Sequence, residues 1–263
     1  MTLDPAKLGA NPPRRTRIVV PCYNEAARLD LGAFRAFAAH EPSVGFVFMN
    51  DGSRDATPAL LRELEACDRD AFSVVDLPRN LGKAEAVRAG LVAGFGSGAE
   101  FVGYWDADLA TPLEEIPRFV EVLTRLPRVD LVFGARVQLL GRSVRRSSVR
   151  HYLGRVFATA VSHVIGLPIY DTQCGAKLLR RTPELEALFA TPFAVGWTFD
   201  VEILARLIRS RAGGALPPAA EVVYELPLDR WHDVAGSKVR PVDFFIAFFE
   251  IAKIWYRYRW RGE

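Results

Sequence analysis

The first half of the chain alternates short apolar runs with longer segments of helical periodicity, and this alternation constrains the fold more than any other feature. The apolar runs, rich in Val, Ile and Phe, are residues 17–21, 44–50, 72–76, 101–105 and 130–133. Apolar residues recur at helical spacing in residues 25–39, 57–67, 82–94 and 113–126. Such alternation is typical of a mostly parallel sheet flanked by helices. We therefore expect an α/β fold whose ligands bind at the carboxyl ends of the strands.

The composition fits one α/β domain in a reducing compartment. The chain has 263 residues, of which 50% are hydrophobic, and this is enough for a full core. Its net charge of only +3 gives no indication of nucleic-acid binding, and we expect none. The three cysteines, Cys22, Cys67 and Cys174, are odd in number and lack Cys-x-x-Cys spacing. We therefore expect free thiols rather than a disulfide framework or a zinc site.

The distribution of apolar, charged and loop-forming residues also predicts the character of the chain ends and the position of loops. Residues 1–16 lack an apolar core, so we expect a flexible lead-in that is neither a signal peptide nor an anchor. The longest charge-free stretch, residues 156–170, is 15 residues long and contains Gly166 and Pro168, so no transmembrane helix is expected. Residues 94–98 and 211–218 are expected to be surface loops.

Asp106-Ala107-Asp108 directly follows the apolar run at residues 101–105. Side chains at i and i+2 of an extended segment point the same way, so both carboxylates can face one hard cation. That cation, Mg2+ or Mn2+, would also take oxygens from a diphosphate. The pattern is short, and solvated loops also produce it by chance. Taken alone the pattern is therefore a weak indication of a metal site formed by Asp106 and Asp108, and the rest of the chain strengthens it.

Polar residues follow three further strands or open the next helix. Pro21-Cys22-Tyr23-Asn24-Glu25 ends the first strand, with Glu25 opening a helix, and Asn50-Asp51-Gly52-Ser53 ends the second. Asn80-Leu81-Gly82-Lys83 places a cation at a helix N-terminus, which suits negative charge. A structural alternative makes Asn24 a helix cap and Glu25 a first-turn acid. The recurrence favours a nucleotide site, formed by Pro21, Tyr23, Asn24, Glu25, Asp51, Lys83, Asp106 and Ala107.

In this order and spacing, the four segments resemble those of the family 2 glycosyltransferases, which have the GT-A fold with a Rossmann-like nucleotide half. Gly134-Ala135-Arg136, Arg150 and the motif at residues 171–177 resemble the branch that glycosylates polyprenyl phosphates. The motifs at residues 196–202 and 230–238 are more similar to the dolichyl-phosphate glucosyltransferases than to the mannose synthases. The resemblance spans residues 17–238. It implies a catalytic domain at residues 17–240, with a nucleotide half at 17–110 and an acceptor half at 111–240.

The resemblance implies a metal-dependent, inverting enzyme that transfers a hexose, glucose in the first instance, from UDP-glucose to a dolichyl or undecaprenyl phosphate. The cation would neutralise charge on the departing diphosphate. An acceptor phosphate is ionised near neutral pH and is its own nucleophile, so no strong general base is required. Three rivals stay open: a glycosyltransferase with a hydroxyl acceptor, a nucleotidyltransferase, and a non-catalytic nucleotide-sugar binder or membrane adaptor.

The remaining site residues also come from the resemblance. Arg136 and Arg150 would bind the acceptor phosphate through the guanidinium fork. Asp171 and Asp200 would act with Asp106 and Asp108 as catalytic or orienting residues. Structural alternatives make Asp171 a cap of the following segment and place Asp200 on a helix surface, paired with Arg206 or a neighbour. The donor sugar and a closing loop would involve Trp197, Trp231, Ser237 and Lys238.

Two departures from the family pattern affect the metal and nucleotide sites. Asn50 stands where many relatives have the first of two aspartates. Ala110 stands where mannose synthases often place a glutamine that helps to ligate the metal. The cation would therefore complete its coordination with phosphate and water.

Two segments, residues 149–165 and 241–260, are expected to form amphipathic helices. The second carries several phenylalanines and ends in tryptophans interleaved with arginines. Such side chains lie well at a lipid headgroup boundary, so we expect residues 241–263 to attach a cytoplasmic enzyme to a membrane surface. Packing on the core and a homodimer contact are the alternatives. Arg142, Arg145 and Arg146 form a basic cluster that suits either solvent or lipid headgroups.

Overall fold

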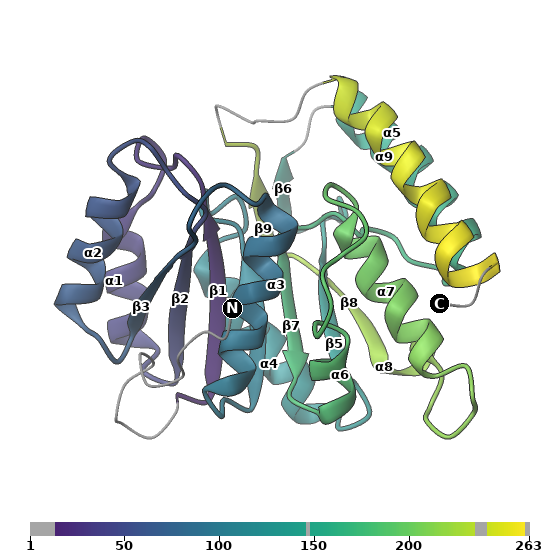
Figure 1. Cartoon of the computed structure of the whole chain (residues 1–263), viewed down its shortest axis with the longest axis horizontal. Coiled ribbons are helices and arrows are strands. Elements are labelled where there is room, and N and C mark those ends of the chain that lie inside the picture. Colours follow the sequence, from purple (N-terminus) through teal and green to yellow (C-terminus); the bar gives the residue numbers. More distant parts are fainter. Residues whose placement is uncertain (1–13, 146–147, 235–240, 261–263) are drawn as a thin grey trace.

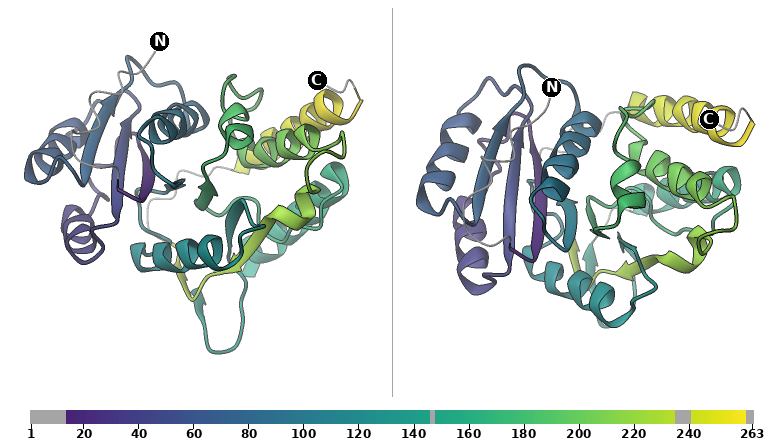
Figure 2. Two further views of the ribbon diagram at one scale, coloured as in Figure 1. Left: turned by 90° about the horizontal axis from the view of Figure 1, so that it is seen from below. Right: turned by 60° about the horizontal axis from the view of Figure 1, so that its bottom comes forward.

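The structure is a computed structural model that describes residues 14–145, 148–234 and 241–260. At its centre is a seven-stranded sheet in the order β3-β2-β1-β4-β7-β5-β8 (Figure 1). Helices lie on both sides of the central strands (Figure 2). The strands of the main sheet are β1 (Thr16–Cys22), β2 (Val44–Asn50), β3 (Phe72–Asp76), β4 (Phe101–Trp105), β5 (Leu131–Ala135), β7 (Ala176–Arg180) and β8 (Val223–Pro227).

Most neighbouring strands of this sheet are parallel. The pairs β1–β2, β1–β4, β2–β3 and β5–β8 are parallel, whereas β7 is antiparallel to both β4 and β5. A second, two-stranded sheet pairs β6 (Ser143–Arg145) with β9 (Arg230–His232). The mostly parallel sheet flanked by helices confirms the predicted α/β fold of the GT-A type.

The helices divide between the two faces of the sheet because successive strand residues point to opposite sides. On one face, α1 (Leu31–His40), α2 (Thr57–Cys67) and α4 (Ile116–Arg125) pack against a phenylalanine-rich cluster. On the other face lie α3 (Lys83–Gly96), α5 (Ser148–Ile165), α7 (Phe199–Ser210) and α9 (Pro241–Ile254). The short elements are η2 (Leu113–Glu115), α6 (Pro183–Ala187), α8 (Ala219–Val222) and the π-helical turn η3 (Trp255–Trp260).

Two expected boundaries are wrong. Glu25 does not open a helix: α1 begins at Leu31, and the N-cap Asp30 accepts the Ala33 N–H at 2.9 Å. Asn24 has a left-handed backbone, with φ 51°, and the Glu25 N–H donates to the Thr57 hydroxyl at 2.8 Å. The Glu25 carbonyl accepts the Arg28 and Leu29 N–H groups at 2.8 and 2.9 Å, so residues 25–29 form a single turn that ends before α1. Likewise, α3 continues to Gly96, so residues 94–96 are helical rather than loop.

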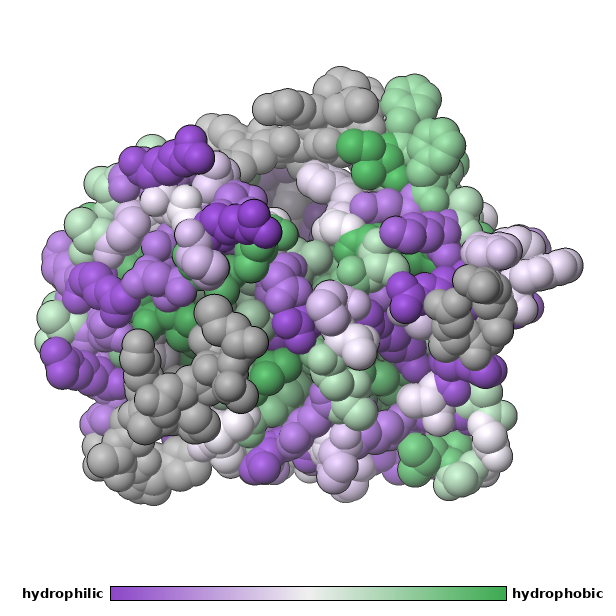
Figure 3. Space-filling view, viewed as in Figure 1, coloured by the Kyte–Doolittle hydropathy of each residue, from purple (hydrophilic) through white to green (hydrophobic). Residues whose placement is uncertain are grey.

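The C-terminal segment both packs on the core and exposes aromatic side chains. Ala247, Ile251 and Ile254 of α9 are buried. Phe249 is 78% exposed, Trp260 is 72% exposed, and hydrophobic surface gathers over α9 at the upper right of the space-filling view (Figure 3). The exposed aromatic face, as we call it, consists of Phe245, Phe248, Phe249, Trp255, Tyr256 and Trp260. Among the described residues, no helix has both the length and the hydropathy needed to cross a bilayer.

Candidate active site

Hydrogen bonds join the two predicted polar segments that follow β1 and β2. The Asn24 N–H donates to the Ser53 hydroxyl at 3.0 Å, and the Asn24 Oδ1 accepts the Arg54 N–H at 2.9 Å. Pro21 and Tyr23 are half-buried beside them, and Glu25 is buried. Parallel neighbours end at the same edge of a sheet, which is why segments about thirty residues apart meet here. The sequence-predicted nucleotide residues of β1 and β2 therefore lie together.

Asp51 organises the loop that leads into α3. Its carboxylate is buried, with Oδ1 accepting the Leu81 N–H at 2.6 Å and Oδ2 the Gly82 N–H at 2.9 Å. Gly82 has φ 91°, which the absence of a Cβ permits. Asp51 thereby fixes the backbone directly before Lys83. At the position of the departure noted in the sequence, Asn50 Nδ2 donates to Asp76 Oδ1 at 2.8 Å.

Asp106 and Asp108 lie in the turn after β4, where cations face both of them. Asp106 Oδ1 is 2.6 Å from Lys83 Nζ, and Asp108 Oδ2 is 3.7 Å from Arg28 Nη1. Arg28 in turn pairs with Glu25 at 2.6 Å. Burial and the neighbouring Asp106 raise the pKa of Asp108 above its ordinary value. The predicted carboxylate pair is thus assembled, and Arg28 joins it although the sequence analysis gave it no role.

Lys83 carries its positive charge at this edge. Burial opposes the charge, but the carboxylates of Asp106, Asp200 and Asp108 outweigh it and raise the pKa of Lys83 above its ordinary value. A lysine at the start of α3 is a point charge that suits phosphate oxygens. Its role next to a diphosphate stays a prediction.

The backbone around the carboxylate pair is unusual. Within the described residues, Asn24 and Leu109 are the non-glycine positions with left-handed φ, at 51° and 53°. Such a conformation costs about 1–3 kcal/mol at a residue other than glycine, and it concentrates at functional sites. Gly175 packs so closely on Asp106 that a Cβ there would overlap the carboxylate. Its carbonyl also accepts the Asp106 N–H at 2.9 Å. Loop geometry and a glycine therefore fix the direction of Asp106.

Behind this pair, Asp200 belongs to a buried polar network. Lys177 Nζ lies 3.0 Å from Asp200 Oδ1 and 2.9 Å from the Tyr104 hydroxyl, which donates to Asp200. Burial and Asp200 raise the pKa of Tyr104 well above its ordinary value, so its hydroxyl stays protonated. Asp200 is only 4% exposed, so the alternative is wrong in placing it on the surface and in pairing it with Arg206, although Asp200 does pair with a neighbour, Lys177. Arg206 instead pairs with Glu202 at 2.8 Å.

Arg136, which is half-buried, and Asp171, which is buried, form a two-point ion pair. Arg136 Nε is 2.7 Å from Asp171 Oδ2, and Nη2 is 2.8 Å from Oδ1. Burial opposes the Arg136 charge, yet Asp171 raises its pKa further above the ordinary value. Trp231 is buried, with its ring centroid 5.4 Å from the guanidinium carbon. The structure therefore brings three predicted residues together, with Trp231 packed on Arg136.

The structure describes only some of the other predicted site residues. Trp197, 38% exposed, directly precedes the N-cap residue of α7. Arg150 lies on α5, but its side chain is outside the described part of the structure. Ser237, Lys238 and Arg146 also lie outside the described residues. In the described ranges, no group of three or more His, Cys, Asp or Glu side chains is placed to hold a metal ion. A cation at Asp106 and Asp108 would therefore need further oxygens from a ligand or water.

The mostly parallel sheet of the GT-A type, with a carboxylate pair at the end of β4, is the architecture of a glycosyltransferase, and the family comparison agrees. Residues 17–186, more than half of the chain, match the family model described as glycosyl transferase family 2. The chain belongs to this family, as its motifs predicted.

The chain is also similar to individual proteins over most of its length. The chain is 29% identical over 242 residues to the dolichyl-phosphate beta-glucosyltransferase of Saccharomyces cerevisiae, covering 84% of this chain and 68% of the yeast protein. The corresponding Mus musculus protein is 30% identical over 247 residues, covering 88% and 71%. The polyprenol monophosphomannose synthase of Mycolicibacterium smegmatis is 28% identical over 245 residues, covering 93% and 89%.

A solved structure shares the fold. The glucosyl-3-phosphoglycerate synthase of Mycobacterium tuberculosis, in complex with Mn2+, UDP and glucosyl-3-phosphoglycerate, superposes with a TM-score of 0.63. The match covers 93% of this chain and 79% of that one at 19% sequence identity. At this identity the likeness establishes the GT-A fold.

Proposed function

We propose that this protein transfers glucose from UDP-glucose to a polyprenyl phosphate, with inversion at the anomeric carbon. The observation that carries the proposal is the Asp106–Asp108 carboxylate pair, faced by Lys83 at the sheet edge where GT-A enzymes bind their donors. The similarity to dolichyl-phosphate beta-glucosyltransferases over most of the chain supports the choice of donor sugar and acceptor.

Asp106 and Asp108 fit a divalent cation of the Mg2+ or Mn2+ type. Both offer hard carboxylate oxygens from one turn, and such oxygens are the ligands these ions prefer. A cation bound there would neutralise charge on the leaving diphosphate. Ala110 offers no ligand, so we expect the metal to bind together with the nucleotide, whose phosphates would supply further oxygens. Lys83 is close enough to Asp106 to reach the same phosphates.

The nucleotide would lie over the ends of β1 and β2, where Pro21 and Tyr23 line the edge. Asn24, Glu25 and Asp51 support this site largely by fixing its loops and Arg28. Preorganised loops reduce the ordering that binding would otherwise require. Trp197, exposed beside the start of α7, is our candidate for contact with the donor sugar.

The acceptor phosphate would bind beside Arg136, together with Arg150 on α5. Asp171 holds the Arg136 fork from one side, so the remaining guanidinium N–H groups are those that a phosphate would use. An ionised phosphate attacks without a general base, which agrees with Asp200 being committed to Lys177 and Tyr104 rather than presented to solvent.

We further propose that the exposed aromatic face of α9 and η3 binds the membrane that contains the lipid acceptor. Phe249 projects from α9, whose opposite side buries Ala247, Ile251 and Ile254, and Trp260 is exposed on η3. Aromatic side chains beside arginines lie favourably at the headgroup level. The protein would then be peripheral to the membrane.

One assay tests this function. Purified protein with Mg2+ or Mn2+ is incubated with labelled UDP-glucose, UDP-galactose or GDP-mannose and with dolichyl or undecaprenyl phosphate in detergent. We expect a glucosylated lipid phosphate from UDP-glucose, and none from the matching polyprenol without phosphate. Transfer only to hydroxyl acceptors, or nucleotide binding without transfer to any acceptor, would refute the proposal.

A further inference from the structure

The C-terminal helix holds the turn that leads into α7. Glu250 of α9 accepts the backbone N–H groups of Gly196 at 2.9 Å, Trp197 at 3.0 Å and Thr198 at 2.7 Å. The Thr198 hydroxyl also donates to Glu250, at 2.9 Å. One carboxylate from a helix about fifty residues further along the chain therefore binds three consecutive backbone donors and a side chain.

The three backbone donors belong to the N-cap residue of α7 and to the two residues before it. Thr198 is the N-cap residue, but its side chain makes no capping bond to the helix and is directed to Glu250 instead. Consecutive N–H groups next to a helix N-terminus form a concave site that favours an anion. Glu250 supplies that anion, so the conformation of the turn depends on how α9 packs against it.

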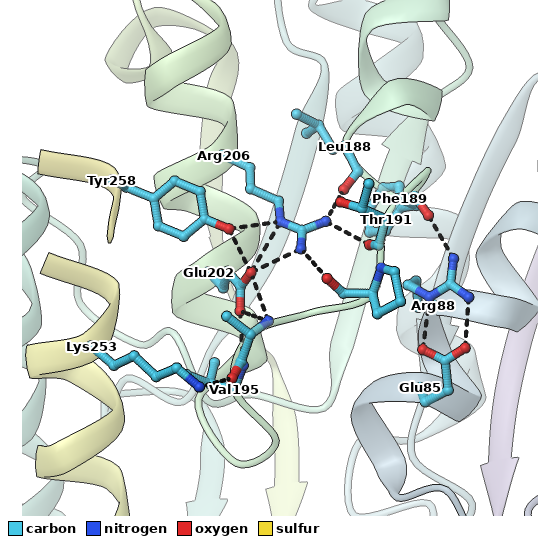
Figure 4. Close-up of polar contacts among 12 residues, drawn as sticks. Glu85, Arg88, Leu188, Phe189, Thr191, Val195, Glu202, Arg206, Lys253 and Tyr258 are labelled. Carbon is cyan, nitrogen blue, oxygen red and sulfur yellow. Dashed lines mark hydrogen bonds and ion pairs between the residues drawn. The ribbon is translucent and has the colours of Figure 1, made fainter. Parts of the chain in front are cut away.

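The rest of the loop that precedes α7, residues 188–198, is fixed from three helices (Figure 4). Glu202 of α7 accepts the Ala194 and Val195 N–H groups at 2.8 and 3.1 Å, and Tyr258 of η3 donates to Glu202 at 2.6 Å. Further bonds to loop carbonyls come from Arg206 of α7 to Thr191 and Pro192, from Lys253 of α9 to Ala194, and from Arg88 of α3 to Phe189.

The turn held by Glu250 continues directly into the site. Trp197 lies within it, and Asp200 follows two residues after Thr198. The Asp200 carboxylate is bound by Lys177 and Tyr104, and Tyr104 lies two residues before Asp106 on the chain. A displacement of the turn would therefore move Trp197 directly and would also shift Asp200, which follows it in the chain.

We propose that Glu250 is a positioning residue for glycosyl transfer: through its hydrogen bonds to Gly196, Trp197 and Thr198 it sets the side of the site that contacts the donor sugar. The inference rests on the proposed function, because that function gives Trp197 its place beside the sugar. It makes α9 part of the catalytic geometry as well as a surface for lipid.

The test compares Glu250→Gln with Glu221→Gln, a matched change at an exposed acid on α8. A third variant, Thr198→Val, removes one donor to Glu250 without changing side-chain size. Transfer from UDP-glucose to dolichyl phosphate and the release of free glucose by hydrolysis are measured on the full chain. Binding to anionic vesicles and the far-ultraviolet spectrum verify lipid attachment and folding.

We expect Glu250→Gln to lower kcat by about tenfold or more, since small misplacements are costly to catalysis. The KM for dolichyl phosphate should stay unchanged, and the ratio of hydrolysis to transfer should rise. Thr198→Val should change the ratio in the same direction by about twofold to fivefold, as for the loss of one hydrogen bond. Glu221→Gln should match the wild type. Folded Glu250→Gln and Thr198→Val proteins with wild-type kcat and wild-type ratio would overturn the inference.

Failure of the proposed function gives a different result. If the wild type transfers no sugar, the quenching of tryptophan fluorescence by UDP-glucose replaces the rate, with Trp197→Phe defining the Trp197 component. Glu250→Gln and Thr198→Val should then reduce that component, whereas an unchanged component in both would overturn the positioning role. If Glu250→Gln does not fold, Thr198→Val decides by the same criteria.

Discussion

Replacing Lys177 with methionine should destabilise the protein severely. The Lys177 side chain is fully buried and donates to three groups: Asp200 Oδ1 at 3.0 Å, the Tyr104 hydroxyl at 2.9 Å and the Cys174 carbonyl at 2.6 Å. Methionine fills a similar volume but leaves the Asp200 carboxylate buried without its cation. Breaking a buried pair in this way costs about 3–5 kcal/mol. That is a large part of the total stability of a domain, about 5–15 kcal/mol.

The assay is urea unfolding followed by circular dichroism and tryptophan fluorescence, with Lys253→Met as the matched control. Lys253 is exposed and donates to one carbonyl, so its loss should cost about 1 kcal/mol or less. The melting temperature of Lys177→Met should fall by roughly 6–20 °C, at about 2–4 °C per kcal/mol for a chain of this size.

A double variant separates the lost charge pair from a general packing defect. Lys177→Met combined with Asp200→Asn removes both charges, so its cost should be less than the sum of the single changes by about 1 kcal/mol or more. A Lys177→Met protein with a loss below about 1 kcal/mol, or strictly additive costs in the double variant, would refute the reasoning about the buried pair.

Three further predictions follow from individual contacts. Gly175→Ala should displace the Asp106 carboxylate, so the transfer rate should fall about tenfold and the metal concentration for half-maximal rate should rise; an unchanged metal titration would contradict this. A thiol reagent at neutral pH should label Cys67 rapidly and spare Cys174, because burial raises the pKa of the Cys174 thiol to about 11; equal labelling rates would contradict the burial. Phe249→Ser should weaken binding to anionic vesicles by about tenfold while leaving the melting temperature unchanged, and undiminished binding would remove α9 from the lipid surface.

The sequence predicted most of the fold because its strands are continuous apolar runs. The runs at residues 44–50, 72–76 and 101–105 are strands with those boundaries. The alternation with helices also predicted that polar segments at different strand ends would meet. Local backbone geometry was harder to predict: Asn24 takes a left-handed conformation, residues 25–29 form a separate turn, and α1 begins only at Leu31.

The parts of the site that were missed depend on long-range pairing. Lys177 reaches Asp200 because β7 inserts antiparallel between β4 and β5, and no local pattern specifies that insertion. Glu250 meets Thr198 across 52 residues of chain. The roles given to the predicted site residues stay predictions, and the side chains of Arg150, Ser237 and Lys238 also lie outside the described part of the structure. The division into a nucleotide half and an acceptor half stays a prediction as well.

The central claim is that Asp106 and Asp108 hold a cation that makes the donor diphosphate a leaving group. The direct measurement is formation of glucosylated dolichyl phosphate from UDP-glucose during a Mn2+ titration, in the wild type and in Asp108→Asn. We predict that wild-type turnover requires the divalent cation and stops with excess chelator, and that Asp108→Asn is slower by about 100-fold or more. Undiminished turnover in chelator, or in Asp108→Asn at every Mn2+ concentration, would contradict the account.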